Sequence, residues 1–332
     1  MQVFVAANFL QVTCARVPRL PRPGEIVLAS STHSEAGGKG LNVALGCRRL
    51  GAEVGALVGI GRDAQGDGLV ALLRSHGIPD THVHRLTETS GMGMGFIGHD
   101  GQNCGAVFAG PNLLLDAAHA ELAQADIAAS DWVYGQFETA LPAVQRCFEL
   151  AQAAGVPTVL NPSPWQAIPD ALLALTQVLL VNEVEAAQLL GTPSPADDGL
   201  AALAHHMHAA VEALWSRWPG RLLVMTAGHR GCIAFTPGQA PWLCPAHAVD
   251  AIDTLGAGDA FASGLIVGLG RGWRDDGAVL ASALRQATAC GALMASSAGV
   301  LDALPSRETL AQFQMSHGEP EVRTLAEVKP AS

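Results

Sequence analysis

The chain contains 332 residues, of which 49% are hydrophobic and only 15% are charged, so it can bury a large core and is not a disordered segment. Its 19 basic and 30 acidic side chains give a formal net charge of −11. This acidic balance argues against a nucleic-acid-binding protein, because such proteins present a basic surface to the phosphates.

The first 110 residues are predicted to combine alternating strands and helices with some extra strands. Buried apolar runs and alternating segments indicate strands, and glycine turns mark where helices begin and end. Asp100 and Gly101 favour a type I′ turn between two short strands. The expected elements, in chain order, are strands at 3–7, 11–17 and 25–34, a helix that opens at 37–40 and closes at Gly51, a strand at 54–61, a helix over 67–76, and a strand pair over 91–100 and 102–110.

From residue 115 onward, the predicted strands and helices alternate regularly. This alternation predicts an α/β fold with a mainly parallel sheet and helices on both faces, and the extra early strands should form a small separate sheet. Beyond residue 313 the chain becomes polar and contains Pro and Glu, which predicts a flexible tail over 314–332. The expected elements are helices at 115–128, 143–154, 183–190 and 200–215, and strands at 131–134, 158–161, 178–181, 221–226 and 231–235.

Seven cysteines are scattered along the chain and form no C-x-x-C pair. This pattern is typical of free thiols in a reducing compartment rather than of a disulfide framework or a zinc site. No apolar run reaches the roughly 18 residues that cross a bilayer, and no basic residue precedes the apolar N-terminus. We therefore expect a cytoplasmic protein that binds neither a membrane nor a nucleic acid.

The strongest chemical signal is a glycine turn that runs into an apolar helix. The turn contains Gly256, Ala257 and Gly258, and the helix starts near Asp259. Backbone N–H groups can converge there at the positive end of the helix, which makes an anion hole. A carboxylate beside such a site can accept the proton of a hydroxyl that attacks phosphorus. The competing interpretation is an ordinary N-cap Asp; the flanking glycines and a second acid at Asp253 weigh against it.

Two other turns carry polar groups at the start of a helix. The glycine turn at 36–46 lacks the spacing of a P-loop, but Lys39 and Asn42 supply donors for a polyhydroxy ligand or a phosphate. A buried strand ends at Asn182, and Glu185 follows in the first helical turn, which is the pattern of a capping box. The same carboxylate would lie at the carboxyl edge of the sheet, where open α/β folds bind ligands.

Together these stretches resemble the ribokinase-like, PfkB-type carbohydrate kinases, and the resemblance runs from residue 1 to about residue 313. The signature D-T-x-G-A-G-D is complete from Asp253 to Asp259 and is highly specific. The other matching elements are GGKG-x-N at 37–42 with its continuation at 51–69, N-x-x-E at Asn182 and Glu185, T-x-G-x-x-G at 226–231, and three stretches that resemble the ribokinases within the family, AGPN at 109–112, QFE at 136–138 and NPSPW at 161–165.

The resemblance implies ATP-dependent phosphorylation of a primary hydroxyl on a sugar, with ATP and Mg²⁺ as cofactors. Asp259 would be the general base, and the backbone amides of Gly256, Ala257 and Gly258 would stabilise the transferring phosphoryl group. Magnesium would be held mostly by phosphates and waters, with Glu185 acting through water. The other implied contacts are Asn8, Gly38, Lys39, Asn42 and Glu138 with the sugar, Asn182, Thr226, Gly228 and Gly231 with ATP, and Asp253 with a monovalent cation.

The resemblance also implies one kinase domain over 1–313. Within it, lid segments at about 10–36 and 90–110 would form a small sheet that closes over the sugar and pairs two copies in a homodimer.

Two positions depart from the ribokinase pattern. Ribokinases carry N-x-D at the end of the first strand, and here Leu10 stands where the Asp would hold two ribose hydroxyls. A sugar hydroxyl without a partner in a dry pocket costs about 1–3 kcal/mol, so ribose itself is disfavoured as the substrate. At the potassium loop Gly299 is kept, but Ala303 replaces a frequent hydroxyl residue, which weakens the implication of K⁺.

Two alternatives stay open beside the sugar kinase. A nucleoside kinase of the same superfamily would share the glycine turn and Asp259, and the apolar pair Phe9 and Leu10 could line its pocket. A sensor that binds a sugar or nucleotide without catalysis could use the same scaffold, although it would have no need of a base.

Overall fold

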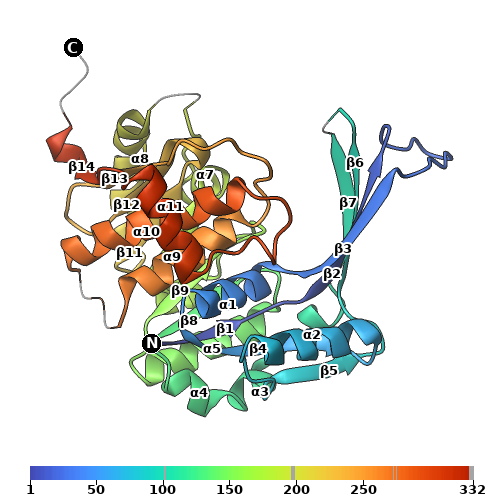
Figure 1. Cartoon of the computed structure of the whole chain (residues 1–332). Coiled ribbons are helices and arrows are strands. Elements are labelled where there is room, and N and C mark those ends of the chain that lie inside the picture. The colour runs from blue at the N-terminus through green and yellow to red at the C-terminus, as the bar shows by residue number, and fades with distance from the viewer. Residues whose placement is uncertain (101, 196–198, 272, 274, 329–332) are drawn as a thin grey trace.

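The computed structural model describes residues 1–100, 102–195, 199–271, 273 and 275–328. Its body is a ten-stranded sheet covered by helices on both faces, and a four-stranded sheet projects from one side of that body (Figure 1). The expected α/β fold and the small separate sheet are both confirmed.

The main sheet is parallel over most of its width. Strands from β11 to β5 in spatial order run parallel, whereas β12, β13 and β14 extend the sheet antiparallel. The carboxyl ends of parallel strands meet at one edge, which is where ligands bind in such sheets. In spatial order the strands are β14 (Arg323–Thr324), β13 (Trp242–Pro245), β12 (Gly231–Phe235), β11 (Leu222–Thr226), β10 (Val178–Asn182), β9 (Thr158–Asn161), β8 (Trp132–Gln136), β1 (Gln2–Ala6), β4 (Glu53–Gly61) and β5 (Val83–Thr87).

Alternate residues of the central strand β1 enter two different hydrophobic cores. Val3 and Val5 pack on one face of the sheet, and Phe4 and Ala6 pack on the other, as a strand buried on both faces requires. The first core is closed by α1 (Lys39–Arg49), α2 (Ala64–Ser75), α9 (Ala257–Leu269), α10 (Gly277–Ala295) and α11 (Arg307–His317). The second is closed by α3 (Ala117–Glu121), α4 (Gln124–Ala128), α5 (Leu141–Ala153), α6 (Asp170–Leu175), α7 (Glu183–Leu190) and α8 (Leu200–Trp215).

Two glycines of α9 allow close packing against α10. A Cβ on Gly264 would lie 2.8 Å from the Cα of Ala287, and one on Gly268 would lie 2.8 Å from the Cα of Ala283. Among the described helices, α10 is the one long and apolar enough to cross a membrane, but 56% of its most apolar window is buried inside the protein. Its apolar composition is that of a core helix.

The small sheet, called the lid sheet below, has the order β3-β2-β6-β7. Its strands are β2 (Leu10–Val17), β3 (Ser31–Gly37), β6 (Met92–Gly98) and β7 (Asn103–Phe108). The expected pairing of the last two is confirmed, whereas the turn predicted at Asp100 and Gly101 includes a residue outside the described ones. The strand expected at 25–34 is wrong in its bounds: β2 pairs with β3 from Leu10↔Gly37 to Arg16↔Ser31, which leaves residues 25–30 without a partner strand.

Two helices also differ from the expectation. The helix α2 begins at Ala64 rather than near 67, because the side chain of Asp63 caps it by accepting the N–H of Gly66 at 2.9 Å. The helix expected over 115–128 is two short helices, α3 and α4, separated at residues 122–123.

The chain does not become a tail at residue 313. Helix α11 continues to His317, β14 then pairs with β13 through Trp242↔Thr324, and Leu325 is buried in the second core. The prediction of a tail over 314–332 is therefore wrong up to residue 328, because a two-residue strand and one apolar side chain anchor the segment; residues 329–332 lie outside the described ones.

Candidate active site

A cleft of about 1010 Å³ runs along the carboxyl edge of the sheet, between the lid sheet and the start of α9. It brings together residues from both glycine turns, from the N-x-x-E and T-x-G-x-x-G stretches and from QFE, whereas AGPN at 109–112 and NPSPW at 161–165 do not line it. The predicted residues that line it are Gly38, Lys39, Asn42, Glu138, Asn182, Thr226, Gly228, Gly231, Asp253, Gly256, Ala257, Gly258 and Asp259. Asn8 and Glu185 are buried and do not line it.

Asn8 links the residues at the end of the cleft where the resemblance implies sugar contacts. Its Nδ2 donates to Glu138 Oε2 at 2.8 Å, and its Oδ1 accepts the N–H of Gly40 at 2.9 Å. Glu138 Oε2 also accepts the N–H of Lys39 at 3.0 Å. Asn8 follows β1, Glu138 follows β8 and the two N–H groups open α1, so one side chain links three elements.

Gly38 is the residue that this arrangement requires. Its φ of 117° lies in a region that L side chains rarely adopt, and a Cβ there would lie 2.6 Å from Asn8 Nδ2. The glycine turn therefore allows the start of α1 to lie close to the end of β1.

Asp259 lies in the first turn of α9, and its carboxylate is buried. Asn42 Nδ2 donates to Asp259 Oδ2 at 2.8 Å, which ties α9 to α1. Burial, with the negative charge of Glu138 adding to it, raises the pKa of Asp259 to about 6, against the opposing effects of Lys39 and the Asn42 hydrogen bond. A carboxyl with such a pKa is ionised at neutral pH and is still able to take up a proton.

Asn42 has a second polar atom that no group in the described part of the chain satisfies. Its Oδ1 is buried and has no hydrogen-bond partner. A buried acceptor of this kind calls for a donor, and the neighbouring cleft is where a ligand hydroxyl could supply one.

The start of α9 carries free backbone donors. Gly256 caps the helix in the left-handed conformation with φ 77° and without a side-chain hydrogen bond, and the N–H of Ala257 donates to Thr254 O at 3.2 Å. In the described part of the chain, the N–H groups of Gly258 and Asp259 have no intrachain acceptor. The N–H of Gly256 likewise has no acceptor there. Of the three N–H groups expected to form an anion hole, those of Gly256 and Gly258 are therefore available to a ligand, whereas that of Ala257 is already bonded.

The end of the cleft where the resemblance implies ATP contacts has exposed residues at Asn182 and Gly228. Asn182 ends β10, and its side chain and that of Glu185 form the expected capping box: Asn182 N donates to Glu185 Oε2, and Glu185 N donates to Asn182 Oδ1, both at 2.9 Å. Thr226 ends β11, and Gly228 and Gly231 follow with φ of 53° and 114°. Each of these predicted residues except Glu185 reaches the cleft.

The residues that could contact a cation can do so through water molecules, because they do not form a cluster of direct ligands. Within the described residues, no group of three His, Cys, Asp or Glu side chains could hold a metal ion. Glu185 Oε2 is used by the capping box, while its Oε1 has no bonded partner in the described chain and could hydrogen-bond a metal-bound water. Asp253 lies exposed at the cleft, where its Oδ1 accepts the N–H of Leu255 at 2.9 Å.

An apolar wall faces the sugar end from the lid sheet. Leu10 and Val12 of β2 both line the cleft, because residues two apart in a strand point to the same face. Phe9 is fully buried and does not line the cleft. Of the two apolar residues expected to line a pocket, only Leu10 does so.

Two residues of the site were missed in the sequence. Gln136 Nε2 donates to Asn8 Oδ1 at 3.2 Å and to Thr139 Oγ1 at 2.8 Å. Gln136 therefore orients Asn8, and Asn8 in turn orients Glu138. Gln136 lies two residues before Glu138 in the QFE motif, at the end of a strand. Its position in that motif is the pattern from which its role could have been predicted. Glu35 of β3 also lines the cleft, and no pattern in the sequence indicated it.

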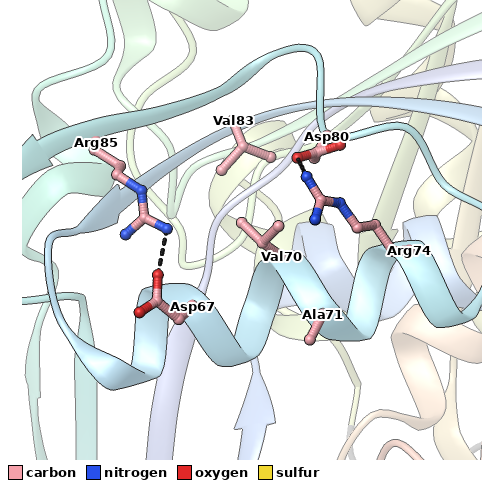
Figure 2. A pocket seen from close by; sticks show the side chains of 7 residues that line it. All are labelled: Asp67, Val70, Ala71, Arg74, Asp80, Val83 and Arg85. Carbon is pink, nitrogen blue, oxygen red and sulfur yellow. Dashed lines mark hydrogen bonds and ion pairs between the residues drawn. The ribbon is translucent and has the colours of Figure 1, made fainter.

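A second hollow, of about 460 Å³, lies between α2 and β5 and is lined by none of these residues (Figure 2). Its charged side chains are already paired, Arg85 with Asp67 at 2.5 Å and Arg74 with Asp80 at 2.8 Å. Paired charges on an exposed surface do not make a binding site for a charged ligand.

Comparison with known proteins agrees with this geometry. Residues 9–307 match the family described as pfkB family carbohydrate kinase. The chain is 29% identical over 299 residues to a ribokinase of Haemophilus influenzae, which covers 90% of this chain and 93% of the relative. It is 30% identical over 245 residues to a deoxyribokinase of Salmonella typhi, which covers 73% of this chain and 77% of the relative.

Solved structures share the fold over almost the whole chain. A ribokinase of Arabidopsis thaliana complexed with ribose and ATP has a TM-score of 0.81 at 23% identity, covering 94% of this chain and 97% of that one. A nucleoside kinase of Burkholderia thailandensis in complex with inosine has a TM-score of 0.71 at 20% identity, covering 96% and 99%. With the family match over nearly all of its length, the chain belongs to the pfkB family of carbohydrate kinases and is an ATP-dependent sugar kinase.

Proposed function

We propose that this kinase transfers the γ-phosphoryl group of ATP to a primary hydroxyl of a pentose-like sugar, with Asp259 as the general base. The observation that carries the proposal is the position of Asp259. It is a buried carboxylate with a raised pKa, it accepts a hydrogen bond from the side chain of Asn42, and it lies at the start of a helix where the N–H groups of Gly256, Gly258 and Asp259 have no acceptor in the described chain.

In the proposed reaction the sugar hydroxyl gives its proton to Asp259 while its oxygen attacks the γ-phosphorus. The bond from the γ-phosphorus to the bridging oxygen breaks, and ADP leaves. The free N–H groups of Gly256 and Gly258, together with that of Asp259, stabilise charge on the transferring group, and the turn through Ala257 holds them in place. Pre-oriented donors are effective here because they need no reorganisation as the charge develops.

The sugar is proposed to lie against the network below Gly38 and Lys39. Glu138 and the free Oδ1 of Asn42 accept hydroxyl hydrogens, while the hydrogen bond from Asn8 holds Glu138 in place. The nucleotide is proposed to lie along Asn182, Thr226, Gly228 and Gly231, which line the other end of the same cleft.

Magnesium and a monovalent cation belong to the same proposal. Magnesium bound to ATP neutralises phosphate charge, and Glu185 would hold one of its waters through Oε1. Asp253 is the residue proposed to contact a monovalent cation such as K⁺, and its exposed carboxylate at the cleft supports that role.

The substrate is proposed to be a sugar other than ribose, because Leu10 presents an apolar surface where two hydroxyls would need an acceptor. Leu10 and Val12 together also favour a second candidate, a nucleoside whose base lies on this wall. Leu10→Asp should raise the kcat/KM for D-ribose about tenfold if the rest of the pocket accepts a pentose.

The test is ADP release by the wild-type protein with ATP, Mg²⁺ and a panel of pentoses, deoxypentoses, hexoses and nucleosides. A sugar with the highest kcat/KM and D-ribose well below it is the expected result. A nucleoside preferred over every sugar supports the second candidate instead. Binding of a sugar without ADP release from any panel member would identify a sensor and overturn the proposal.

A homodimer through the lid sheet is also proposed. Met94, Phe96, Val107 and Phe108 of β6 and β7 are exposed apolar side chains on a sheet that projects from the body (Figure 1). Light scattering after gel filtration should give twice the chain mass of 34.2 kDa, and a monomer mass would contradict it.

A further inference from the structure

One carboxylate connects the lid sheet to the half of the molecule that carries the anion hole. Glu35 lies on β3, opposite Val12 of β2, and lines the cleft. Its Oε2 accepts the N–H groups of Val300 and Leu301, each at 3.3 Å. The other side-chain hydrogen bonds of the four lid strands, in the described part of the chain, stay within the lid sheet.

The segment that Glu35 contacts is held from its other side as well. Arg49, at the end of α1, donates to Leu301 O at 2.6 Å and to Asp302 O at 3.4 Å. Residues 300–302 are therefore fixed between a carboxylate of the lid and a guanidinium of the body. The two Glu35 hydrogen bonds share one carboxylate oxygen as their acceptor, so loss of that carboxylate removes both at once.

The same segment packs directly behind the anion hole. Val300 is buried, and a Cβ on Gly256 would lie 3.0 Å from Val300 Cγ1. Gly256 is the cap of α9, two residues before the free N–H of Gly258. A shift of residues 300–301 would therefore displace the turn whose N–H groups face the transferring phosphoryl group.

We infer that Glu35 is a positioning residue, which couples the place of the lid sheet to the geometry of the anion hole. The lid sheet supplies Leu10 and Val12 to the end of the cleft proposed for the sugar, and the anion hole is proposed to act on the phosphoryl group, so the contact links the two ends of the reaction. This inference rests on the proposed function for its kinetic consequence, while the contact itself stands on the hydrogen bonds.

The experiment compares Glu35→Ala, Glu35→Gln and the matched control Glu25→Ala. Glu25 is also a carboxylate in the segment that joins the lid strands, but it pairs with Arg19 of the same segment and does not reach the body. Each variant is assayed for kcat and for the KM of ATP with the best sugar of the panel. Hydrogen exchange then reports on the amides of Val300 and Leu301 without any substrate.

The expected result is a kcat about 10- to 100-fold lower in Glu35→Ala, since misplacing catalytic groups by about 1 Å costs up to about 100-fold. The KM for ATP should change less than about threefold, because the contact acts on alignment rather than on binding. Glu35→Gln keeps one acceptor oxygen and should recover most of the kcat. The amides of Val300 and Leu301 should exchange faster in Glu35→Ala than in Glu25→Ala.

Three results would overturn the inference: a kcat of Glu35→Ala equal to that of Glu25→Ala, unchanged exchange of the two amides, or a Glu35→Gln as impaired as Glu35→Ala. The exchange measurement separates this failure from a failure of the proposed function. If the wild-type protein phosphorylates no panel member, the proposed substrate is wrong, and exchange still decides whether Glu35 holds the segment.

Discussion

The two ends of the cleft are built in different ways. At the sugar end, Asn8, Asn42 and Asp259 are all buried and are linked by hydrogen bonds across β1, β8, α1 and α9. At the end proposed for the nucleotide, Asn182 and Gly228 are exposed, and Glu183 and His229 line the cleft beside them. Under the proposed function, the chemistry and the choice of sugar would depend on a buried hydrogen-bonded network, whereas the nucleotide would be held on a more exposed edge.

Removing the carboxylate at the centre of the buried network should have the largest effect. Asp259→Asn keeps the shape and the contact with Asn42 but cannot accept a proton, so kcat should fall about 10²- to 10⁴-fold, the usual contribution of a general base. ATP affinity, measured by calorimetry, should stay the same because the nucleotide lies at the other end. A kcat near that of the wild type would remove Asp259 from the mechanism.

The two glycines of the anion hole should separate catalysis from folding. Gly258 has open space where a Cβ would be, so Gly258→Ala should fold normally and place a methyl group at the cleft, with kcat reduced about 10- to 100-fold. Gly256→Ala should instead lower stability by about 1–3 kcal/mol, because φ is 77° there and the Cβ would lie 2.9 Å from Met294 Cε.

Thermal unfolding gives the stability, and steady-state kinetics the kcat, of Gly258→Ala and Gly256→Ala. Equal loss of stability in the two would show that the turn has only a structural role.

Burial of Asp259 should also make stability depend on pH. The folded pKa of about 6 lies above the ordinary 3.8, so the unfolded state loses its proton first as pH rises. Stability is therefore full below about pH 4, falls between pH 4 and 6, and is lower by about 3 kcal/mol above pH 6. Urea unfolding at pH 4.5 and pH 8 should show Asp259→Asn more stable than the wild type only at pH 8.

The activity of the wild type should respond in the opposite direction over the same range. Because the base must be ionised, kcat/KM should rise with pH through about 6 with the slope of a single proton. A flat profile between pH 5 and 7 would contradict the assignment of Asp259 as the base.

The smallest effect is expected at the open end of the cleft. Asn182→Ala removes one half of the capping box with Glu185, which should lower stability by about 1 kcal/mol. The KM for ATP should rise no more than about threefold, because an exposed side chain makes a small net contribution. A loss of kcat as large as that of Gly258→Ala would show that the two ends are not built differently.

Much of this site could be predicted from local pattern. The turn from Gly256 to Asp259, the capping box of Asn182 and Glu185, and the glycine turn before Lys39 are all short-range arrangements of backbone and side chain. The alternation of strands and helices placed them at the same edge of a parallel sheet. The limits of β3 and the anchoring of β14 could not be predicted in this way, because they depend on which distant strand is available for pairing.

By itself the sequence determined the α/β class, the family signature, and the residue types at both ends of the cleft, because turns, caps and strand periodicity are properties of neighbours in the chain. Only the tertiary structure decided that the side chain of Asn42 meets that of Asp259, and that Phe9 faces the core while Leu10 faces the cleft. It also brought Glu35 to Val300, 265 residues away. Such contacts join segments that meet only when the helices and the lid sheet are packed around the main sheet, and burial then sets which polar groups remain available to a ligand.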